Sequence, residues 1–566
     1  MSIELKSIEE LINHGRYLEA RERSLVLRAD TSVDAQRVTQ LLALSTSKCG
    51  SPELAVEYLT SLYAQFPNDS ETAGILGGIY KSIFRKQQNT KFAILSRDTY
   101  AKNFEQTGNY YTGINAATMS VIAGKAQQGR ELAQQVILKL ENTATSEWEW
   151  ASLAEAYLLT KSRDKAITTF TKARQLIGTD WGKVLSVYNQ LWLLDHYMPV
   201  PKEVFKIFAP PVVIAFTGHM LDAPGRETPR FPADIEHQVK QAIKAALNTL
   251  NASVGYCSLA CGADILFAEA MAERGGEVQV VLPFAAADFI NISVAFAGLE
   301  WVHRFKALQT KYPNLVLTRE RYGGNDDLFV LLGKSIFGSA ILRSRSYQQE
   351  PFLLTVLSEF DLKRKEGGTR DMLQLWPFGQ RHTNINPDPL VTTVLPNEAA
   401  PQEQLPINPI YDRPVLYQVW LDVSKLIATE RSTVIKAIKT RVDGNASVKL
   451  MEEYPEAVWI GMDTEIALLD LVRLVWNEVT PLKQEKPVRV VLQAAPVKVK
   501  TAMSDSDADT LSTIAKVIPH GIIFATATMA SVLALYPKKF HLEQVGSINV
   551  APEQGYQDIF KVEFIR

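Results

Sequence analysis

Short apolar runs alternate with amphipathic segments through the middle of the chain, and this alternation constrains the fold more than any other feature. The runs have the length and composition of buried parallel strands. They fall at residues 212–216, 254–258, 278–282, 315–318 and 352–357. Helical spacing is found between them, at residues 232–250, 263–274, 300–311 and 327–343. Five strands alternating with helices predict a doubly wound α/β domain built on a parallel sheet.

The first 200 residues follow a different periodicity, in which small and large apolar residues recur at fixed spacings. One copy comprises Trp150, Leu153, Ala154, Tyr157, Ala166, Phe170 and Ala173. A second, offset copy comprises Ala55, Leu59, Leu62, Pro67, Ala73, Leu76, Gly77 and Tyr80. In a tetratricopeptide-type hairpin the small residues let two helices approach and the large ones fill the gaps. Residues 5–200 are therefore predicted to be an all-α repeat array, with Trp150, Tyr157 and Phe170 buried.

One segment of the array is more specific. Residues 110–118 resemble the tetratricopeptide-like region of the apoptosis-signal-regulating kinases, a TRAF-binding domain that bacterial proteins also carry. The resemblance implies a protein partner on the helical repeats. Stacked hairpins present a concave surface suited to such a partner, and no residue in this region indicates chemistry.

Charge and cysteine usage exclude several classes of protein. The net charge of −2, from 60 basic and 62 acidic residues, excludes the broad positive field of a general nucleic-acid or anionic-membrane binder. Cys49, Cys257 and Cys261 suit neither a disulfide framework nor a zinc site, so we expect buried thiols in a reducing compartment. The start lacks a signal-peptide core, and residues 521–535 fall short of the ~20 needed to span a bilayer. We expect a cytoplasmic protein without membrane contact.

Changes in pattern divide the chain into four segments. The repeat array is assigned to residues 1–205 and the strand–helix domain to residues 206–376. Residues 377–414 hold eight prolines and are predicted to form an extended linker. Residues 415–566 mix helices with strands and predict an α+β domain. Its strands are expected at residues 415–423, 488–492, 521–525 and 559–564.

The loops after the strands of the middle domain predict a ligand site, because open parallel sheets bind ligands beyond the carboxyl ends of their strands. Glycines there allow backbone amides to approach a ligand, and a helix beginning at Ala263 would direct its free N–H groups at an anion. The predicted ligand-binding residues are Thr217, Gly218, His219, Arg226, Gly262, Pro283, Arg343, Gly367, Gly368 and Thr369.

Four short segments of this domain resemble the SLOG superfamily of Rossmann-like domains, which includes relatives of DNA-processing protein A and the cytokinin-activating hydrolases. The segments are residues 216–219, 261–269, 281–284 and 367–369, within a match over about residues 210–376. The resemblance implies a nucleotide or nucleotide-derived ligand and, in some relatives, cleavage of an N-glycosidic bond. Gly367-Gly368-Thr369 lacks the longer glycine-rich loop and trailing Glu of the phosphoribohydrolases, so binding is better supported than hydrolysis.

N-glycosidic cleavage passes through an oxocarbenium-like transition state and requires a carboxylate near the anomeric carbon. Asp264 and Glu269 are the candidates, with Asp222 third. Asp264 also fits a structural role beside a helix dipole, and Glu269 fits one on a solvated helix face. His219, among the predicted ligand contacts, could equally be a hydrogen-bonded turn residue. For the arginines Arg226 and Arg343, a surface ion pair is the alternative to a phosphate contact.

The last segment resembles the class III nucleotidyl cyclases at residues 416–426, 489–497 and 511–523. An active cyclase holds two metal ions with two carboxylates. Asp422 matches the first, but residues 455–463 lack the Gly-Asp pair that carries the second. Ser512 and Lys516 stand where the family has Asn and Arg. The resemblance therefore implies a pseudo-cyclase in which Asp422 is a vestigial metal position, with homodimerisation or weak nucleotide binding as its remaining role.

Together these features favour a bacterial-type signalling or conflict-response protein. In this interpretation the array binds a partner, the SLOG-like domain binds a nucleotide-derived ligand, and no metal or cofactor is required. One alternative is an N-glycosidase acting on a nucleotide or NAD-like substrate. The other is a non-catalytic scaffold. Release of free base from nucleotides would distinguish the enzyme from the sensor.

Overall fold

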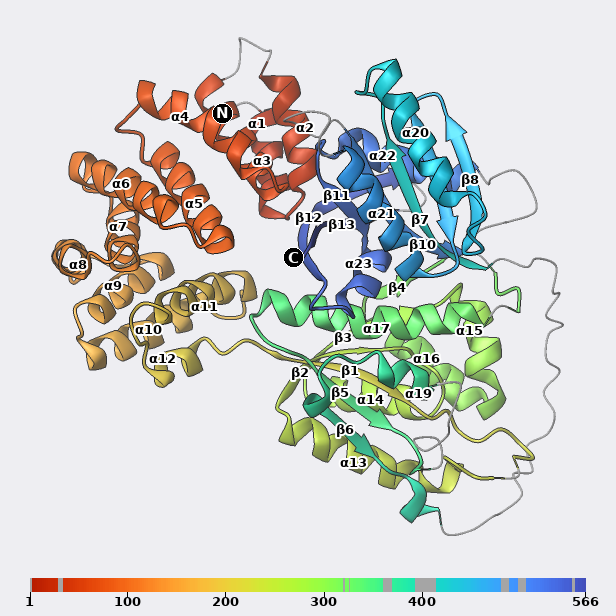
Figure 1. Cartoon of the computed structure of the whole chain (residues 1–566). Coiled ribbons are helices and arrows are strands. Elements are labelled where there is room, and N and C mark those ends of the chain that lie inside the picture. The colour runs from red at the N-terminus through yellow and green to blue at the C-terminus, as the bar shows by residue number, and fades with distance from the viewer. Residues whose placement is uncertain are drawn as a thin grey trace. The chain divides into compact units, whose positions relative to one another are not determined.

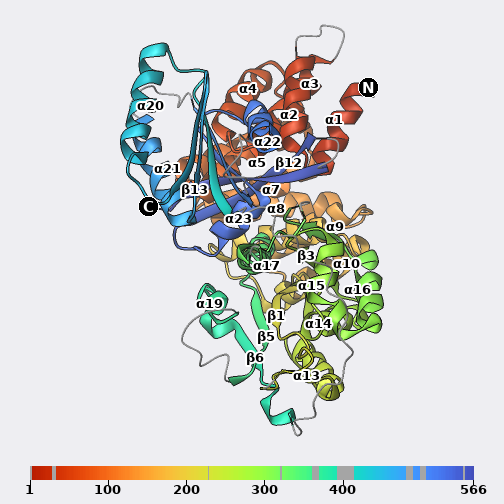
Figure 2. The ribbon, with the colours of Figure 1, turned by 90° about the vertical axis from the view of Figure 1, so that its right-hand side faces the viewer.

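The computed structural model describes the chain in ten stretches: residues 3–28, 34–226, 228–318, 321–324, 326–359, 369–391, 414–479, 488–496, 505–551 and 555–565. The chain divides into two compact units (Figures 1 and 2). One unit comprises residues 1–210 with residues 545–548, and the other comprises residues 211–544 and 549–566.

The first unit, up to residue 210, is helical wherever its described residues form regular structure, which confirms the predicted repeat array (Figure 1). From α1 to α11 consecutive helices pack against each other, and α12 packs on α10. The helices are α1 (Ile3–Asn13), α2 (Tyr17–Leu27), α3 (Ala35–Lys48), α4 (Pro52–Gln65), α5 (Ser70–Gln87), α6 (Thr90–Thr107), α7 (Tyr110–Ile122), α8 (Ala126–Leu140), α9 (Glu147–Leu159), α10 (Arg163–Ile177), α11 (Trp181–Asp195) and α12 (Lys202–Ile207).

Local sequence explains where these helices begin and how closely they pack. Ser146 and Glu149 form a capping box at the start of α9, which satisfies amides that have no acceptor within the helix. Gly77 on α5 lies against the fully buried ring of Tyr100 on α6, and a Cβ at residue 77 would come 2.7 Å from Tyr100 Cζ. The small position predicted at Gly77 is therefore what allows this pair of helices to approach.

The predicted core of the array is confirmed at two of three positions. Tyr157 is 6% exposed and Phe170 is 1% exposed. Trp150 is only half-buried, so its prediction as a core residue is wrong. It lies in the first turn of α9 at the margin of the core, and the Lys172 ammonium lies over its indole at 5.5 Å from the ring centroid.

A polar network joins four alternate helices of the array. Lys81 on α5 donates to Asn115 on α7 (2.8 Å) and to Gln190 on α11 (3.2 Å). Gln190 donates to Glu155 on α9 at 2.8 Å, and Thr118 on α7 also donates to Glu155. Burial lowers the pKa of Lys81 to about 8 and raises the pKa of Glu155. The network connects helices that are distant in sequence.

The second unit begins with a six-stranded sheet in which all neighbouring strands are parallel. The strand order is β4-β3-β2-β1-β5-β6. Strands β2, β3 and β4 are added on one side of β1, and strands β5 and β6 are added on its other side. The strands are β1 (Val212–Gly218), β2 (Ala252–Cys257), β3 (Glu277–Leu282), β4 (Asn314–Val316), β5 (Phe352–Val356) and β6 (His382–Ile385). The predicted parallel sheet is confirmed.

Helices cover both faces of this sheet (Figures 1 and 2). Helices α13 and α14 lie on one face and α17 on the other. The helices of this region are α13 (Glu236–Thr249), α14 (Ala263–Glu273), α15 (Ala286–Ser293), α16 (Leu299–Lys311), α17 (Asp327–Ser346) and α19 (Thr369–Gln374).

Strand β6 lies within the segment predicted to be a linker. Its sequence, His-Thr-Asn-Ile, has no apolar run, and side-chain hydrogen bonds fix it to β5. Thr355 donates to Asn384 at 2.7 Å, and Asn384 donates to the carbonyl of Leu357 at 2.9 Å. Periodicity could not reveal such an edge strand. Residues 392–413 of the predicted linker lie outside the described residues.

The rest of the second unit contains a seven-stranded mixed sheet with the order β12-β13-β11-β10-β7-β9-β8, in agreement with the predicted α+β class. From β7 to β10 the elements follow the split β-α-β-β-α-β arrangement. The elements are β7 (Val415–Asp422), α20 (Ala428–Val442), β8 (Val448–Tyr454), β9 (Ala457–Met462), α21 (Glu465–Val479), β10 (Arg489–Pro496), α22 (Asp505–Val517), β11 (Ile523–Thr526), α23 (Ala527–Ala534), β12 (Phe540–Ala551) and β13 (Gly555–Phe564).

Helix α17 connects the two sheets, because it packs on β1 of the first sheet and on α23 of the second. At the crossing of α17 and α23, Gly338 lies so close to the Ser531 carbonyl that a Cβ at residue 338 would overlap it. The adjacent Ser339 hydroxyl lies 3.0 Å from the Ser531 hydroxyl. Among the described helices of the chain, none is both long and apolar enough to cross a membrane.

Candidate functional site

The carboxyl edge of the six-stranded sheet brings together the loops after β1, β2 and β3. Thr217 and Gly218 end β1, and Pro283 directly follows β3. A Cβ at Gly218 would lie 2.6 Å from the Ala263 Cβ, so the end of β1 rests against the start of α14. These predicted residues thus lie at the expected edge of the sheet.

Gly262, the residue before α14, is required by the backbone. Its φ of +97° is unfavourable for other residues. A Cβ at Gly262 would also lie 2.7 Å from Leu221 N and 2.9 Å from His219 O. The space beside Gly262 is therefore filled by the loop after β1. A larger residue at position 262 would therefore disturb the contact between this loop and the start of α14.

The N-terminus of α14 offers backbone donors at this edge. The first amides of a helix have no acceptor within it. The Ala263 amide donates to His219 O at 3.0 Å, and the Leu266 amide donates to Gly262 O at 3.1 Å. The amides of Asp264 and Ile265 lie between them, at the positive end of the helix dipole. Asp264 is 7% exposed and Ile265 is fully buried, so an anion could reach these amides only if the adjacent loop moved.

His219 is a hydrogen-bonded residue of the loop after β1. Its backbone N–H donates to Val356 O at 3.0 Å, and the Ser358 N–H donates to its Nε2 at 2.9 Å. An Nε2 atom that accepts this bond carries no proton. The side chain, 6% exposed, ties the loop after β1 to the loop after β5.

Asp264 is 7% exposed and lies beneath the loop that precedes α14. The Ser258 hydroxyl donates to its Oδ2, while its buried Oδ1 has no hydrogen-bond partner among the described residues. Burial raises the pKa of Asp264 to about 7, against hydrogen bonds from Ser258 and the Ala260 amide. A ligand at the edge of the sheet could reach this carboxyl only if the loop moved.

Asp222, the third candidate acid, closes the long loop after β1. Its Oδ2 accepts hydrogen bonds from Arg230 N at 2.9 Å and Phe231 N at 3.0 Å. Arg226 Nε lies 3.4 Å from Asp222 Oδ1, and the Arg226 side chain is 35% exposed. Asp222 thus shapes the loop, and Arg226 is placed near solvent beyond β1.

Two predicted site residues lie elsewhere. Glu269 accepts hydrogen bonds from Arg304 of α16 (2.7 Å) and Lys240 of α13 (2.8 Å). Burial alone would raise its pKa, but these two cations hold the pKa of Glu269 below its ordinary value. Arg343 pairs with Glu277, the first residue of β3, at 3.3 Å, which places it at the amino edge of the sheet. The predictions of Glu269 as a catalytic acid and Arg343 as a ligand contact are therefore not met by this geometry.

The last predicted loop is only partly described. Gly367 and Gly368 lie outside the described residues, and Thr369 is described only as the first backbone position of α19. No placement at the sheet edge follows for these three residues.

Sequence reasoning missed a group at the same edge. Arg321 and Tyr322, in the loop after β4, both bond to Asp288 in the first turn of α15. The Tyr322 ring packs on Phe284, which follows β3 by two residues, with a centroid distance of 4.8 Å. Two adjacent polar residues in a loop produce no hydrophobic periodicity. Their contact with Asp288 is therefore evident only from the folded structure.

In the seven-stranded sheet, Asp422 is held by protein groups. Its Oδ1 accepts from Ser424 N at 2.8 Å, and Arg489 Nη1 lies 3.3 Å from its Oδ2. Asp463, at the far end of β9, pairs with Lys449 at 3.1 Å. Across the described part of the chain, no cluster of three or more His, Cys, Asp or Glu residues could hold a metal ion.

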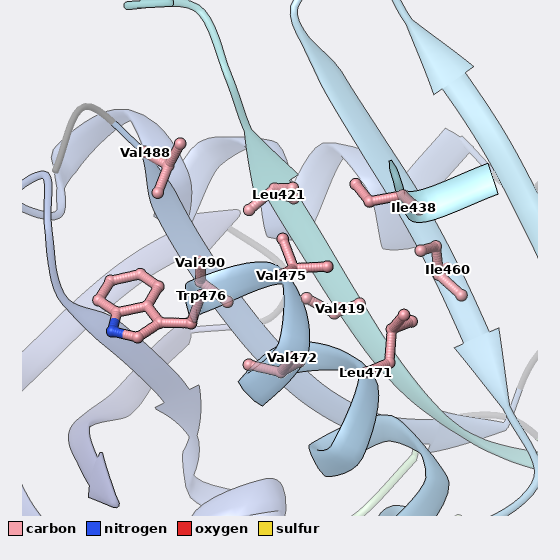
Figure 3. Close-up of a pocket in the computed structure, with 10 residues that line it drawn as sticks. All are labelled: Val419, Leu421, Ile438, Ile460, Leu471, Val472, Val475, Trp476, Val488 and Val490. Carbon is pink, nitrogen blue, oxygen red and sulfur yellow. The ribbon is translucent and has the colours of Figure 1, made fainter. Parts of the chain in front are cut away.

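A pocket in this sheet is apolar (Figure 3). It lies among β7, β9, β10, α20 and α21. Its lining residues are Val419, Leu421, Ile438, Ile460, Leu471, Val472, Val475, Trp476, Val488 and Val490. Its walls carry no carboxylate, imidazole or thiol, so the pocket is part of the hydrophobic core rather than a site for chemistry.

Comparisons with known proteins support the helical array. The family model described as Tetratricopeptide Repeats-Sensor (TPR-S) matches residues 16–120. No curated protein matches this chain.

Solved structures with similar arrays share little sequence with the chain. A TPR protein of Thermus thermophilus is 16% identical over 33% of this chain and 97% of its own, with a TM-score of 0.28. MamA MSR-1 is 19% identical over 30% and 92%, with a TM-score of 0.22. A tetratricopeptide repeat protein of Parabacteroides merdae is 9% identical over 36% and 82%, with a TM-score of 0.25. The match to the TPR-S model, together with the helical hairpins of the first unit, identifies the N-terminal region as a TPR-like helical repeat region.

Proposed function

We propose that this protein is a non-catalytic signalling protein. Its repeat array binds a protein partner, and the carboxyl edge of its six-stranded sheet binds an anionic, nucleotide-derived ligand. The observation that carries the ligand site is the N-terminus of α14, where the amides of Asp264 and Ile265 follow a glycine turn at the edge of a parallel sheet.

The array supports the partner-binding part of the proposal. TPR-like arrays serve as scaffolds for protein–protein interaction, because their stacked hairpins expose an extended concave surface. The buried Lys81 and Glu155 are both hydrogen-bonded to Gln190, so these two charged groups serve the packing of the array. Binding of a partner is therefore a more natural role for the array than chemistry.

The positions of the acids favour binding over N-glycosidase activity at the sheet. Cleavage needs a carboxylate against the anomeric carbon. Glu269 is bound to Arg304 and Lys240, and Asp264 lies under the loop before α14. Asp222 accepts backbone hydrogen bonds within its own loop. None of the three is presented to a ligand at the α14 N-terminus.

The resemblance of the last segment to cyclases adds a regulatory module to the proposal. The split β-α-β-β-α-β order from β7 to β10 supports this resemblance. Arg489 already neutralises Asp422, so a metal ion would have to displace an ion pair. We therefore assign this sheet no turnover of nucleoside triphosphates.

Isothermal titration calorimetry with AMP and NAD tests the ligand site. Arg226→Ala removes a cation at the carboxyl edge, and Arg274→Ala removes one at the opposite end of α14, where Arg274 bonds Asn248 at 2.7 Å. We expect binding by the wild type and by Arg274→Ala, and binding weakened several-fold by Arg226→Ala. Mass spectrometry of the incubated nucleotide should show no free base. Absence of binding would overturn the ligand site, and release of base would favour the N-glycosidase.

A further inference from the structure

The first helices of the hairpins line the inner side of the repeat array. Helix α7 packs on both α5 and α9, so the first turns of these three helices are neighbouring steps of one surface. The second residue of each helix is exposed there: Glu71 in α5, Tyr111 in α7 and Trp148 in α9. The Glu71 side chain is 57% exposed, Tyr111 is 47% exposed and Trp148 is 39% exposed. We call these three residues the inner row.

The ring of Tyr111 is held in place although it is exposed. It lies edge-on to the ring of Tyr100, with centroids 6.3 Å apart and the planes at 86°. A Cβ at Gly74 would come 3.2 Å from Tyr111 Cε1, so the ring occupies the space that this glycine leaves on α5. Partial burial raises the pKa of Tyr111, and the nearby charge of Glu71 also raises it. A partner that stacks on Tyr111 therefore meets a preorganised ring beside a carboxylate.

The inner row lies in an acidic part of the array. The first turns of α5, α7 and α9 contain three glutamates and no lysine or arginine. Glu147, next to Trp148, pairs with Lys183 of α11 at 2.8 Å. Glu71 pairs with Arg37 of α3 at 3.0 Å, and that arginine is shared with a second glutamate on α1. The positive dipole ends of these helices lie beside the negative ends of the preceding helices, so side chains determine the charge. The surface is aromatic and negatively charged.

Helix α11 closes the deeper half of the inner surface. Leu193 of α11 packs in a cluster with Phe84 of α5 and with residues of α6 and α7. Lys81 of α5 donates to Gln190 of α11 at 3.2 Å, and the Phe84 ring lies 6.1 Å from that of Tyr197. Other residues of α11 belong to the core of α9 and α10. A partner therefore reaches the inner surface at the first turns, where the inner row lies.

The spacing of the helices suits an extended chain. Packed helices lie about 8–10 Å apart, close to the length of three residues of polyproline II backbone. One extended segment can thus present its residues i and i+3 to Tyr111 and Trp148. Arginine and lysine side chains stack on aromatic rings and pair with carboxylates.

We propose that the inner row binds an extended basic segment of a partner protein. Two cationic side chains of the segment stack on Tyr111 and Trp148, and a third pairs with Glu71. This inference rests on the proposed binding of a partner by the array. It specifies where that partner docks and which charge its docking segment carries.

Three fluorescein-labelled dodecapeptides with the repeats Arg-Pro-Pro, Glu-Pro-Pro and Leu-Pro-Pro test this surface. Fluorescence anisotropy measures their binding to the full chain at low and high salt. The arginine peptide should bind roughly ten-fold more tightly than the other two and should weaken as the salt concentration rises. Trp148→Leu and Tyr111→Leu should each weaken it about five-fold, as expected for a lost cation–π contact. Glu71→Gln should weaken it and reduce its dependence on salt.

Trp192→Leu is the matched control, because Trp192 is 37% exposed in the last turn of α11. It should leave binding of the arginine peptide unchanged. Unfolding midpoints of the Trp148 and Tyr111 variants close to that of the wild type establish that the comparison reports on the rings rather than on folding.

The outcomes separate this inference from the proposed function. Equal binding of the arginine and glutamate peptides, or arginine-peptide binding that survives Trp148→Leu, would overturn the basic segment. Tighter binding of the leucine peptide that is lost in Trp148→Leu would overturn the charge preference and leave the array as a peptide-binding surface. Binding of none of the peptides would overturn docking at the inner row. The ligand site at the six-stranded sheet is tested separately by calorimetry and is unaffected by these outcomes.

Discussion

Lys334 on α17 donates a 2.7 Å hydrogen bond to Glu465 on α21, and both side chains are buried. The Tyr417 and Tyr536 hydroxyls complete the cluster, at 2.9 Å from Lys334 Nζ and from Glu465 Oε1 respectively. Burial would raise the pKa of Glu465, but Lys334 holds it below its ordinary value. The pair joins the six-stranded sheet to the seven-stranded sheet, so the two are expected to unfold together.

Breaking this pair should be costly. Lys334→Met leaves Glu465 as a buried charge without its cation and should lower the free energy of unfolding by about 3–5 kcal/mol. The double variant Lys334→Met/Glu465→Gln should recover part of that loss. Urea unfolding followed by circular dichroism measures both changes. A single variant as stable as the wild type would contradict the role assigned to the pair.

The crossing of α17 and α23 gives a second test. Gly338→Ala places a methyl group against the Ser531 carbonyl and should destabilise the chain by roughly 1–3 kcal/mol or more. Gly379→Ala is the matched control, because a Cβ at residue 379 meets nothing within 4 Å and Gly379 has no positive φ. Its effect should stay within about 0.5 kcal/mol. Thermal unfolding of the two variants side by side distinguishes local packing from a general effect of replacing glycine.

The raised pKa of buried Asp264 should make the stability of the chain depend on pH. Its pKa rises from 3.8 to about 7 on burial, so the folded chain holds this proton over a range in which the unfolded chain has released it. Stability should therefore fall as the pH rises from about 4 to about 7, by up to ~1.4 kcal/mol per pH unit. Asp264→Asn removes this contribution, so its stability relative to the wild type should be higher at pH 8 than at pH 5. Unfolding midpoints at the two pH values measure the difference, and an unchanged difference would contradict the burial of a titrating acid.

In the repeat array, exposure should decide the cost of losing an aromatic side chain. Phe170 is 1% exposed, and Phe170→Ala should cost about 3–5 kcal/mol. Trp150 is half-buried at the margin of the core, so Trp150→Ala should cost clearly less. Chemical denaturation of both variants provides the comparison. An equal or greater loss for Trp150→Ala would place that indole in the core after all.

The sequence predicted those features that depend on periodicity. Alternating apolar runs placed β1, β2, β3 and β5, and small residues such as Gly77 marked where helices approach. Strand β6 was not predicted because its sequence has no apolar run; backbone pairing with β5 and the Asn384 side-chain bonds hold it in the sheet.

The candidate site was less predictable, because position along the chain does not determine which partner a charged group finds. Glu269 ends the segment 261–269 that resembles the SLOG domains, yet its place on α14 brings it to Arg304 and Lys240. Asp288 lies in the first turn of α15, and its partner Arg321 comes 33 residues later and meets it only in the folded chain.

The central claim is that an anionic, nucleotide-derived ligand binds at the carboxyl edge of the six-stranded sheet. Hydrogen-exchange mass spectrometry of the full chain, with and without saturating AMP, tests it most directly. The account predicts slower exchange in the peptides that contain residues 218–222 and 258–266, where the loop after β1 meets the start of α14. Protection confined to other segments, or no protection at all, would contradict it.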